Sequence, residues 1–358
     1  MTGPESEAQP LPPAAAVEID ATRVMGVLNV TPDSFSDGGQ HFDTAAAIFR
    51  AREMVEQGAD VIDVGGESTR PGAQPVDPLD EQRRVIPVIE GIIEMLGSTS
   101  SNAGPPSAGS GSVRSGSAGS GSAGSGSVGS GSVRPIALGP RSAVRISIDT
   151  RNADTARRAV GAGATLINDV SATLATTAAE LGVGWVAMHM LGDPRTMQAS
   201  PLYDDVVDDV KAFLVERASE AVRLGVKEIW IDPGIGFGKT IAHNMELLSR
   251  LDEIVAEGFP VLIGTSRKRF LGELTARSDA HLAPLHPPVR SGSTVAKGTA
   301  VETENSTSPA PSDVPSRLDA SLATATWAML KGAKMVRVHD VDATAQAVAV
   351  ISGSIPGR

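Results

Sequence analysis

The chain alternates short apolar runs with longer segments of helical periodicity, and this alternation occurs eight times. The apolar runs, which have the length of buried strands, are Val24–Val30, Val61–Val64, Val144–Ile148, Thr165–Ile167, Gly184–Met188, Glu228–Ile231, Val261–Ile263 and Met335–Val338. The helix-period segments that follow them are Thr44–Gln57, Asp80–Leu96, Asn152–Ala162, Ala175–Leu181, Val206–Leu224, Ala242–Ala256, Arg317–Lys331 and Ala343–Ile351. Parallel strands need helical crossovers, and eight strand–helix units close a barrel. We therefore predict a single-domain α/β protein with the (β/α)8 TIM-barrel architecture; a doubly wound open sheet is the structural alternative.

Three segments of low complexity shorten the part of the 358-residue chain that can form this barrel. Residues 97–141 are dominated by Gly and Ser, residues 278–316 are rich in Pro, Ser, Thr and Gly, and residues 1–20 are rich in Pro, Ala and Glu. Such segments have little apolar surface to bury, so ordering them costs entropy without compensation. We expect a disordered arm at 1–20 and disordered insertions at 97–141 and 278–316, within one barrel that spans 21–355.

Charge and cysteine content exclude several classes of function. The formal net charge is −11 and no basic stripe is present, which argues against a nucleic-acid partner. The chain has no cysteine, so disulfides, thiolate metal sites and a cysteine nucleophile are impossible. No uncharged apolar run reaches the roughly 18 residues that span a bilayer, and the N-terminal sequence does not resemble a secretory signal. We expect a cytoplasmic protein without a membrane partner.

Polar residues gather directly after the apolar runs. Asp149 follows the third run, Asp232 follows the sixth, and Arg337 and His339 lie at the end of the eighth. The loops before the runs are short and bland, as at Gly163-Ala164. In a barrel all C-terminal strand ends converge on one face, which carries the active site. This asymmetry predicts an enzyme or a specific small-molecule binder.

These polar segments resemble, in chain order, those of the dihydropteroate synthase family. The matching segments are VMGVLNVTPDSFSDGG, DVGGESTRPG, ISIDT, LINDVS, MHMLGDPRTMQ, IDPGIGFGKT, GTSRKRFLG and VRVHD, and they cover residues 24–351 apart from the two insertions. The resemblance implies a pterin-binding transferase of folate biosynthesis. Such an enzyme condenses 6-hydroxymethyl-7,8-dihydropterin pyrophosphate with p-aminobenzoate, releases 7,8-dihydropteroate and pyrophosphate, and is a sulfonamide target.

The resemblance assigns the pterin to residues at five strand ends. They are Asp149, Asn168, Met188, Asp232, Phe237 and Lys268. Carboxylates and an amide suit the donors on a pterin edge, an ammonium suits its acceptors, and Met188 and Phe237 would cover the ring faces. The alternative for Asp149 and Asp232 is helix N-capping, and the alternative for Met188 and Phe237 is ordinary core packing.

The resemblance assigns the pyrophosphate to Asn29, Thr69, Arg337 and His339. Arg337 and His339 are two residues apart on a strand, so their side chains point the same way, and a guanidinium suits phosphate oxygens. It also implies Mg²⁺ as cofactor with Asn29 as a ligand, because Mg²⁺ needs few protein ligands when phosphates supply the rest. The residues that it implies for catalysis are Asp37, Lys268, Arg337 and His339.

The p-aminobenzoate site falls on mobile loops after the first and second strands and on the segment after the seventh. The resemblance implies Phe35, Thr69, Arg70, Pro71 and Arg269. Backbone N–H groups of Ser266–Arg269, at the start of a helix, are expected to be free for the substrate carboxylate. Arg269 stands where many family members have Ser, so a hydroxyl contact is lost there. Ala172 stands where Gly is common, and we expect a local backbone adjustment.

Other motifs in the chain allow further interpretations. Gly234–Thr240 is similar to a P-loop, but Pro233 occupies the position of its first glycine, so we reject that function. His189 and His243 belong to no zinc-ligand pattern. The functional rivals are a methyltetrahydrofolate-binding methyltransferase and a non-catalytic pterin-binding paralogue. A homodimer is an expectation from the family alone.

Overall fold

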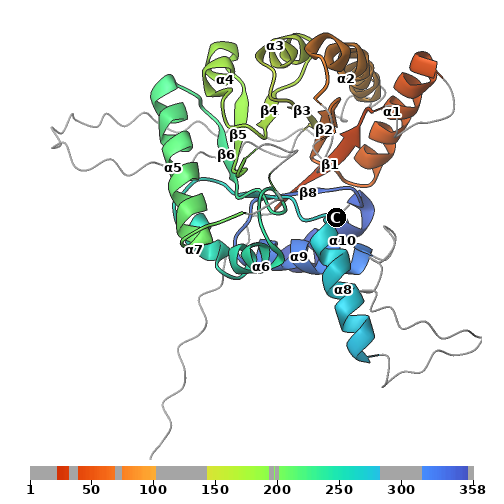
Figure 1. Cartoon of the computed structure of the whole chain (residues 1–358). Helices are drawn as coiled ribbons and strands as arrows, with labels where there is room; N and C mark the ends of the chain where they lie inside the picture. Colours follow the sequence, from red (N-terminus) through yellow and green to blue (C-terminus); the bar gives the residue numbers. More distant parts are fainter. Residues whose placement is uncertain are drawn as a thin grey trace, which may run out of the picture.

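The structure, a computed structural model, describes residues 22–31, 39–68, 75–101, 143–192, 197, 201–282 and 317–353 (Figure 1). Its strands are β1 (Arg23–Asn29), β2 (Val61–Gly65), β3 (Arg145–Asp149), β4 (Leu166–Asp169), β5 (Gly184–Met188), β6 (Ile229–Asp232), β7 (Leu262–Ile263) and β8 (Met335–Val338). Its helices are α1 (Gly39–Glu56), α2 (Pro78–Ser101), α3 (Ala153–Gly161), α4 (Ala175–Leu181), α5 (Val206–Leu224), α6 (Ile241–Ser249), α7 (Leu251–Val255), α8 (Arg269–Leu282), α9 (Leu318–Leu330) and α10 (Val341–Ser352).

The strands form one parallel sheet that closes on itself. Their order is β6-β5-β4-β3-β2-β1-β8-β7, and a parallel bridge between Ile231 and Val261 joins the two ends. The N–H of Ile231 also donates to the carbonyl of Pro260 at 3.0 Å. Helices surround the strands, as Figure 1 shows. The predicted (β/α)8 barrel is confirmed, and the open-sheet alternative is wrong.

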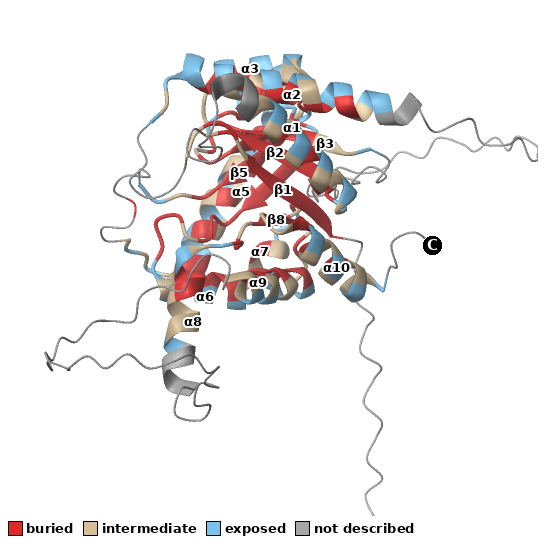
Figure 2. Ribbon diagram, turned by 90° about the vertical axis from the view of Figure 1, so that its right-hand side faces the viewer, coloured by how far each residue is buried: buried red, intermediate tan, exposed pale blue. Residues whose placement is uncertain are grey.

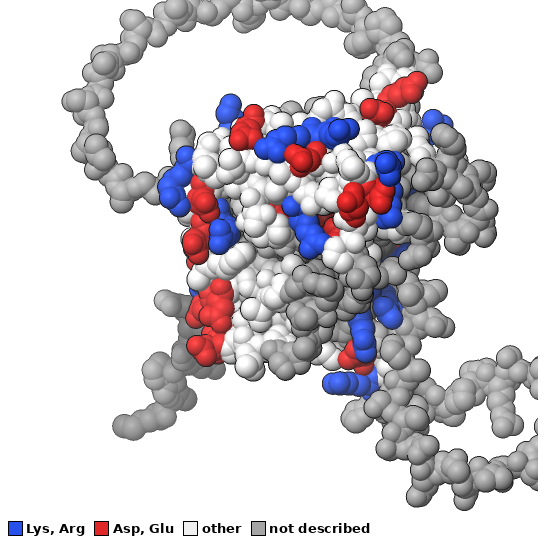
Figure 3. Space-filling model, turned by 45° about the horizontal axis from the view of Figure 1, so that its top comes forward, with Lys and Arg blue, Asp and Glu red and all other residues white. Residues whose placement is uncertain are grey.

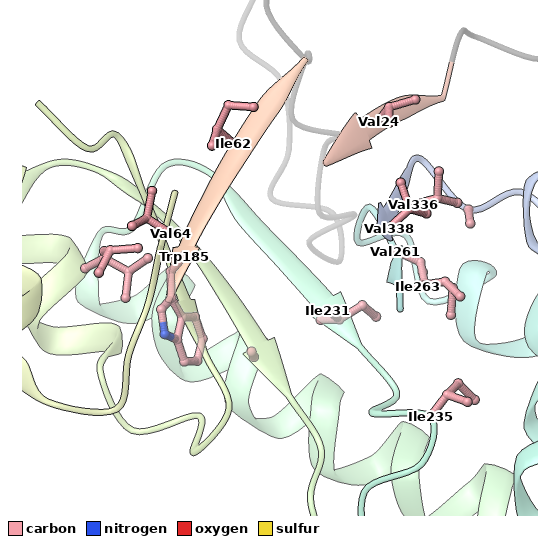
Figure 4. Close-up of a cluster of buried hydrophobic side chains, with 14 of the residues drawn as sticks. Val24, Ile62, Val64, Trp185, Ile231, Ile235, Val261, Ile263, Val336 and Val338 are labelled. Atoms are coloured by element: carbon pink, nitrogen blue, oxygen red, sulfur yellow. The ribbon is translucent and has the colours of Figure 1, made fainter. Parts of the chain in front are cut away.

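Residues along each strand alternate between the helices and the barrel interior. The outward set forms the larger apolar core; Ile62, Val64, Ile231 and Val336 belong to it, and Figure 4 shows them with their neighbours. The inward set forms a second, smaller cluster, made of Met25, Val61, Leu166, Val186, Trp230, Leu262 and Met335. The strands are buried on both faces, whereas the helices expose their outer faces (Figure 2). The buried apolar surface on both sides holds the strand ends in fixed positions.

The next inward residues, two positions further towards the C-terminal ends of several strands, are polar. Asp63 is in register with Ser147 across β2 and β3, and both are fully buried. Asn168 on β4 and Arg337 on β8 occupy inward positions two residues after Leu166 and Met335. The barrel interior is therefore apolar in its middle layer and polar towards the C-terminal strand ends.

The helices differ most from the sequence-based expectation after β6 and after β7; in addition, α1 begins five residues earlier than expected and α2 ends five residues later. The predicted helix Ala242–Ala256 is split into α6 and α7, because Arg250 has φ −104° and ψ 23° between them. A further helix, α8, precedes α9 in the connection from β7 to β8. Among the described residues no helix is both long and apolar enough to cross a membrane.

Candidate active site

Polar strand-end residues meet around the guanidinium of Arg337. Its Nε donates to Asp63 Oδ2 at 2.6 Å, and its Nη2 donates to Asp149 Oδ2 at 2.6 Å. Asp63 Oδ2 also accepts from Asn168 Nδ2 at 2.9 Å. Charge-assisted hydrogen bonds of this kind are strong and directional. We call Asp63, Asp149, Asn168 and Arg337 the arginine cluster; it joins four strands of the barrel.

Burial controls ionisation in this cluster. It raises the pKa of Asp149 to about 7; the Arg337 guanidinium opposes this shift, and the Asp63 carboxylate adds to it. Burial alone would lower the pKa of Arg337, but the Asp63 and Asp149 carboxylates raise it above its ordinary value. Arg337 therefore stays charged, whereas Asp149 titrates near neutral pH.

Lys268, which follows β7, faces Phe237, which follows β6. The Lys268 Nζ lies 3.9 Å from the centroid of the Phe237 ring, within cation–π range. Burial and the charge of Arg337 lower the pKa of Lys268 to about 8, while Asp232 opposes the shift. Burial also raises the pKa of Asp232. Asp232, which is buried, and Lys268, which is partly buried, thus form a second pair of ionisable groups beside the arginine cluster.

The helix-capping alternative is wrong for both aspartates. The N-cap of α3 is Asn152 and the N-cap of α6 is Thr240. Asp232 Oδ1 instead accepts from the N–H of Gly234 at 2.7 Å, and Asp149 bonds to Arg337. The Asp232 bond shapes the loop after β6, and the Asp149 bond orients a guanidinium.

Met188 and Phe237 belong to one small apolar cluster, which also contains Val170 and Met197. Both side chains are buried, as ordinary core packing also predicts. The ammonium over the Phe237 ring distinguishes this cluster from the main core, because it places a cation against an apolar wall. A flat, electron-poor ring and a cation can both use the face of an aromatic side chain.

His339 continues the inward direction of Arg337 at the end of β8. Its Nδ1 lies 3.2 Å from Ser266 Oγ, and its backbone N–H donates to the same oxygen at 3.1 Å. Burial, together with the nearby Arg337 charge, lowers the pKa of His339 to about 3. The imidazole is therefore neutral at physiological pH, and Ser266 orients it.

Asn29 at the end of β1 lies near Asp149. A Cβ added to Gly65 would lie 3.6 Å from Asp149 Oδ2 and 3.8 Å from Asn29 Oδ1, so glycine leaves space between these oxygens. Among the described residues no group of three His, Asp or Glu side chains is arranged to hold a metal ion. Asn29 could supply one oxygen ligand to Mg²⁺, and the remaining ligands would have to come from the phosphates of a substrate and from water.

The predicted p-aminobenzoate residues are only partly described. Phe35, Thr69, Arg70 and Pro71 lie outside the described residues, and so does Asp37, which was predicted to act in catalysis. Arg269 is described, and its side chain is exposed and paired with Glu273 one turn along α8.

The expected free N–H groups before α8 are already used at two positions. The N–H of Arg267 donates to Ser321 Oγ at 3.0 Å, and that of Lys268 donates to the carbonyl of Thr265 at 3.2 Å. The prediction is wrong for these two because a turn at Thr265 and a contact with α9 consume the donors. Arg267 also has a φ of 57°, so the turn holds a non-glycine residue in the left-handed region.

Ala172 adopts a positive φ of 52° and remains buried. The local adjustment expected for this departure from glycine is therefore a left-handed alanine, a conformation that is sterically costly with a Cβ. Asp169 holds the same turn, since its carboxylate accepts from the N–H groups of Ser171, Thr173 and Leu174.

Asp63 is the main residue that the sequence-based assignment missed. It interrupts an otherwise apolar strand at an inward position, and the period of two along β2 places it beside Arg337. A carboxylate in a buried strand needs a cation or several hydrogen-bond donors. The inward position of Asp63 in an apolar strand therefore predicts a buried cationic partner. The sequence-based assignment also gives no role to Lys239 or to the hydroxyl of Ser266, which contacts His339.

Charges of both signs are interspersed on the surface of the described part shown in Figure 3. The net charge of −11 adds no general attraction for anions. Arg337 and Lys268 are the cations of the site, and the carboxylates of Asp63, Asp149 and Asp232 beside them balance their charge, so an anion would be bound through the directed N–H groups of these two side chains rather than through a net positive field.

Comparisons with known proteins identify the family to which the chain is similar. A model of the family described as "Pterin binding enzyme" matches residues 25–100 and 133–339. The chain is 36% identical over 341 residues to dihydropteroate synthase from Haemophilus influenzae, which covers 93% of this chain and 94% of the relative.

Solved structures give the same result. The chain is similar to Xanthomonas albilineans dihydropteroate synthase with 4-aminobenzoic acid, with a TM-score of 0.67, 36% identity, and coverage of 94% of this chain and 95% of that chain. The same enzyme with 7,8-dihydropteroate gives a TM-score of 0.64 and 34% identity, with coverage of 94% and 96%.

Proposed function

This chain belongs to the dihydropteroate synthase family of pterin binding enzymes, and from that premise we propose how its residues carry out the family's reaction. The enzyme is a transferase that joins 6-hydroxymethyl-7,8-dihydropterin pyrophosphate to p-aminobenzoate, giving 7,8-dihydropteroate and pyrophosphate. The observation that carries the residue assignment is the convergence of Asp63, Asp149 and Asn168 on Arg337, with Lys268 and Asp232 beside them.

The dihydropterin is bound by the arginine cluster and by its neighbours Lys268 and Asp232. Asp149, Asp232 and Asn168 offer acceptors to the amino and N–H groups of the ring, and Lys268 donates to its acceptors. Met188 and Phe237 provide apolar contact to the ring faces. An analogue that leaves one of these buried groups unpaired loses about 1–3 kcal/mol per group, which gives selectivity.

Arg337 is also proposed to contact the pyrophosphate tail. Its guanidinium, the neutral imidazole of His339, and the side chains of Asn29 and Thr69 are proposed to bind the tail. The leaving group departs as negative charge develops on its oxygen, and the exocyclic methylene becomes electrophilic. Mg²⁺, held by Asn29 and the phosphates, would neutralise pyrophosphate charge when bound.

The amine of p-aminobenzoate then attacks the methylene, forms the C–N bond and loses a proton. Phe35, Thr69, Arg70, Pro71 and Arg269 are proposed to hold this second substrate, and Asp37 to lie near the positive charge that develops on the pterin. No covalent enzyme intermediate is required. Catalysis arises from positioning and from electrostatic groups fixed in advance.

Three properties remain proposals from the family premise: Mg²⁺ dependence, a homodimer and a cytoplasmic location. Sulfonamides, which compete with p-aminobenzoate, should inhibit the enzyme. A methyltetrahydrofolate-binding methyltransferase handles no pyrophosphate, so Arg337 and His339 would lack a use in it. A non-catalytic paralogue would bind pterins without turnover.

Release of pyrophosphate from the purified full chain tests the function. We expect release only when dihydropterin pyrophosphate, p-aminobenzoate and Mg²⁺ are all present, with 7,8-dihydropteroate formed in equal amount. Pterin binding without release would identify a non-catalytic paralogue. Methyl transfer from methyltetrahydrofolate would identify the rival enzyme class.

The rate should depend on pH through Asp149 and Lys268. As pH falls through about 7, Asp149 gains a proton and loses its charged bond to Arg337; as pH rises through about 8, Lys268 loses a proton and its charge. We therefore expect kcat/KM for the dihydropterin substrate to be highest between these values and to fall on both sides. Kinetics across this range would test this, and Asp149→Asn should remove the acid limb. A flat profile would contradict the assignment.

A further inference from the structure

The glycine-rich segment after β6 ends in a lysine whose role is not explained by the residues assigned above. Lys239 is buried, with 2% of its surface exposed. Its Nζ donates to the carbonyl of Phe237 at 3.0 Å and to that of Gly234 at 3.1 Å, and it lies 2.9 Å from His189 Nδ1. An ammonium has three protons, and these neutral groups receive them. Lys239 therefore points into its own loop rather than towards an anion.

The loop that Lys239 holds lies directly on the segment after β5. A Cβ at Gly234, where φ is 65°, would lie 1.9 Å from the carbonyl oxygen of His189. A Cβ at Gly238, where φ is 62°, would lie 2.4 Å from that of Leu191. Glycine is required at both positions for this close approach. The lysine joins the two segments from within, because its bonds reach residues on both.

A neutral histidine completes the contact. Burial, followed by the Lys239 charge, lowers the pKa of His189 to about 3, so the ring is neutral and, in the tautomer with its proton on Nε2, Nδ1 accepts a hydrogen bond from the ammonium. The rings of Tyr203 and Phe213 lie 6.0 and 5.1 Å from the imidazole, and Tyr203 Oη donates to the Gly238 carbonyl at 2.8 Å. The far side of the loop is therefore also fixed.

The near side of the loop carries residues assigned to the pterin. Met188 precedes His189, and it packs in the same apolar cluster as Phe237. The N–H of Gly234 donates to Asp232 Oδ1 at 2.7 Å, and Lys268 stands over the Phe237 ring. A shift of this loop would displace all of these groups together.

We propose that Lys239 is a positioning residue for dihydropterin binding: it ties the β6–α6 loop to the end of β5 and so sets the relative placement of Met188, Asp232 and Phe237. The inference rests on the proposed function, since it assumes that these residues contact the pterin. Lys239 itself does not touch substrate. It acts through the carbonyls of Gly234 and Phe237.

The protonation of Lys239 adds a signature that core packing would not produce. Burial and the charge of Lys268 lower its pKa to about 7, while Asp232 raises it. The ionisable groups that face it are Asp232 on β6, Lys268 after β7 and the neutral His189 after β5. As pH rises through about 7, the lysine loses a proton and one of its three hydrogen bonds, so the loop should loosen. The alkaline fall of kcat/KM for the dihydropterin substrate should therefore begin below the pKa of Lys268, which places the maximum close to pH 7.

Kinetics of two lysine variants and one control test the proposal. Lys239→Met removes every donor and should raise KM for dihydropterin pyrophosphate about ten- to thirtyfold, with KM for p-aminobenzoate and kcat changing less than about threefold. Lys239→Gln keeps two N–H donors and should restore part of the affinity. Arg145→Met, which breaks the Arg145–Glu228 pair at the opposite end of the barrel, should lower Tm and leave both KM values unchanged.

A folded Lys239→Met protein with wild-type KM for the pterin substrate would overturn the inference, as would an equal rise in both KM values. If the variants do not fold, hydrogen exchange of the wild-type chain decides. The hydrogen-exchange protection of the backbone amides of residues 234–238, measured relative to that of α5, should fall as pH rises, with a midpoint near the pKa of Lys239. Relative protection that does not change with pH would overturn the proposal. Failure of the wild-type protein to turn over the two substrates would refute the proposed function. Hydrogen exchange needs no substrate, so it tests the role of Lys239 in the loop separately.

Discussion

Asp63→Asn should lower kcat/KM for dihydropterin pyrophosphate by about 100- to 1000-fold. Asp63 lies deeper in the barrel than the strand ends, so we expect it to act through Arg337 rather than by contact with the substrate. One of the Asp63 oxygens accepts from both Arg337 and Asn168. An amide oxygen can still accept from both groups, with the NH2 in the position of Oδ1, which has no hydrogen-bond partner, but the charge is lost and the guanidinium lacks one of its two carboxylate partners in a buried site. Breaking such a pair costs about 3–5 kcal/mol. We expect part of this cost to lower the free energy of unfolding and the rest to appear as a displaced Arg337 guanidinium.

Asp63→Asn should also change the pH profile. The Asp63 carboxylate is one of the groups that raise the pKa of Asp149, so its removal should move the acid limb of kcat/KM to lower pH. Steady-state kinetics over pH and denaturant unfolding measure the two effects.

Glu228→Gln is the matched control. It breaks a carboxylate–guanidinium pair with Arg145, with bonds of 2.7 and 2.9 Å, at the opposite end of the barrel. The control should lose stability but keep kcat/KM. An Asp63→Asn enzyme within threefold of wild type would show that Arg337 needs no carboxylate from β2.

Element positions were predictable where local signals agree. The bounds of β5, β8, α4 and α5 match the expectation, because apolar periodicity and flanking glycine or polar residues mark the same limits. The break between α6 and α7 has no such signal. Arg250 at this break donates to Glu253 and also to Asp205, which precedes α5. A contact between separate elements therefore helps to fix the position of Arg250, and the local sequence does not reveal it.

The candidate site was predictable as a set of strand-end residues but not as a set of pairs. Asp149, Asn168 and Arg337 were expected to converge, and they do. The position of Asp63, which bonds to both Asn168 and Arg337, depends on how β1 brings β2 and β8 into register, and a single strand does not reveal this. The donors used up at Arg267 and Lys268 likewise depend on a turn and on α9, rather than on the local motif.

Lys268→Met should reduce kcat/KM for the dihydropterin substrate by about 100- to 1000-fold without reducing stability. The side chain keeps its apolar length over Phe237 but loses the ammonium that is proposed to donate to the pterin. Because the folded-state pKa lies below 10.5, at about 8, keeping Lys268 charged costs stability at neutral pH, and this cost disappears as pH rises from 8 towards 10.5. The free energy of unfolding at pH 7 should therefore be unchanged or higher by up to about 2 kcal/mol.

The matched control is Lys331→Met on α9. Lys331 also has an aromatic neighbour, with its Nζ 5.5 Å from the Trp327 ring centroid, and it bonds to Asp252 at 2.7 Å. It lies nearer the solvent and outside the candidate site, so the control should lose at most about 1 kcal/mol of stability and no activity. Measurement of kcat/KM and urea unfolding on both variants separates the two lysines. An active Lys268→Met enzyme would remove the ammonium from pterin recognition, because the substitution preserves almost everything else about the side chain.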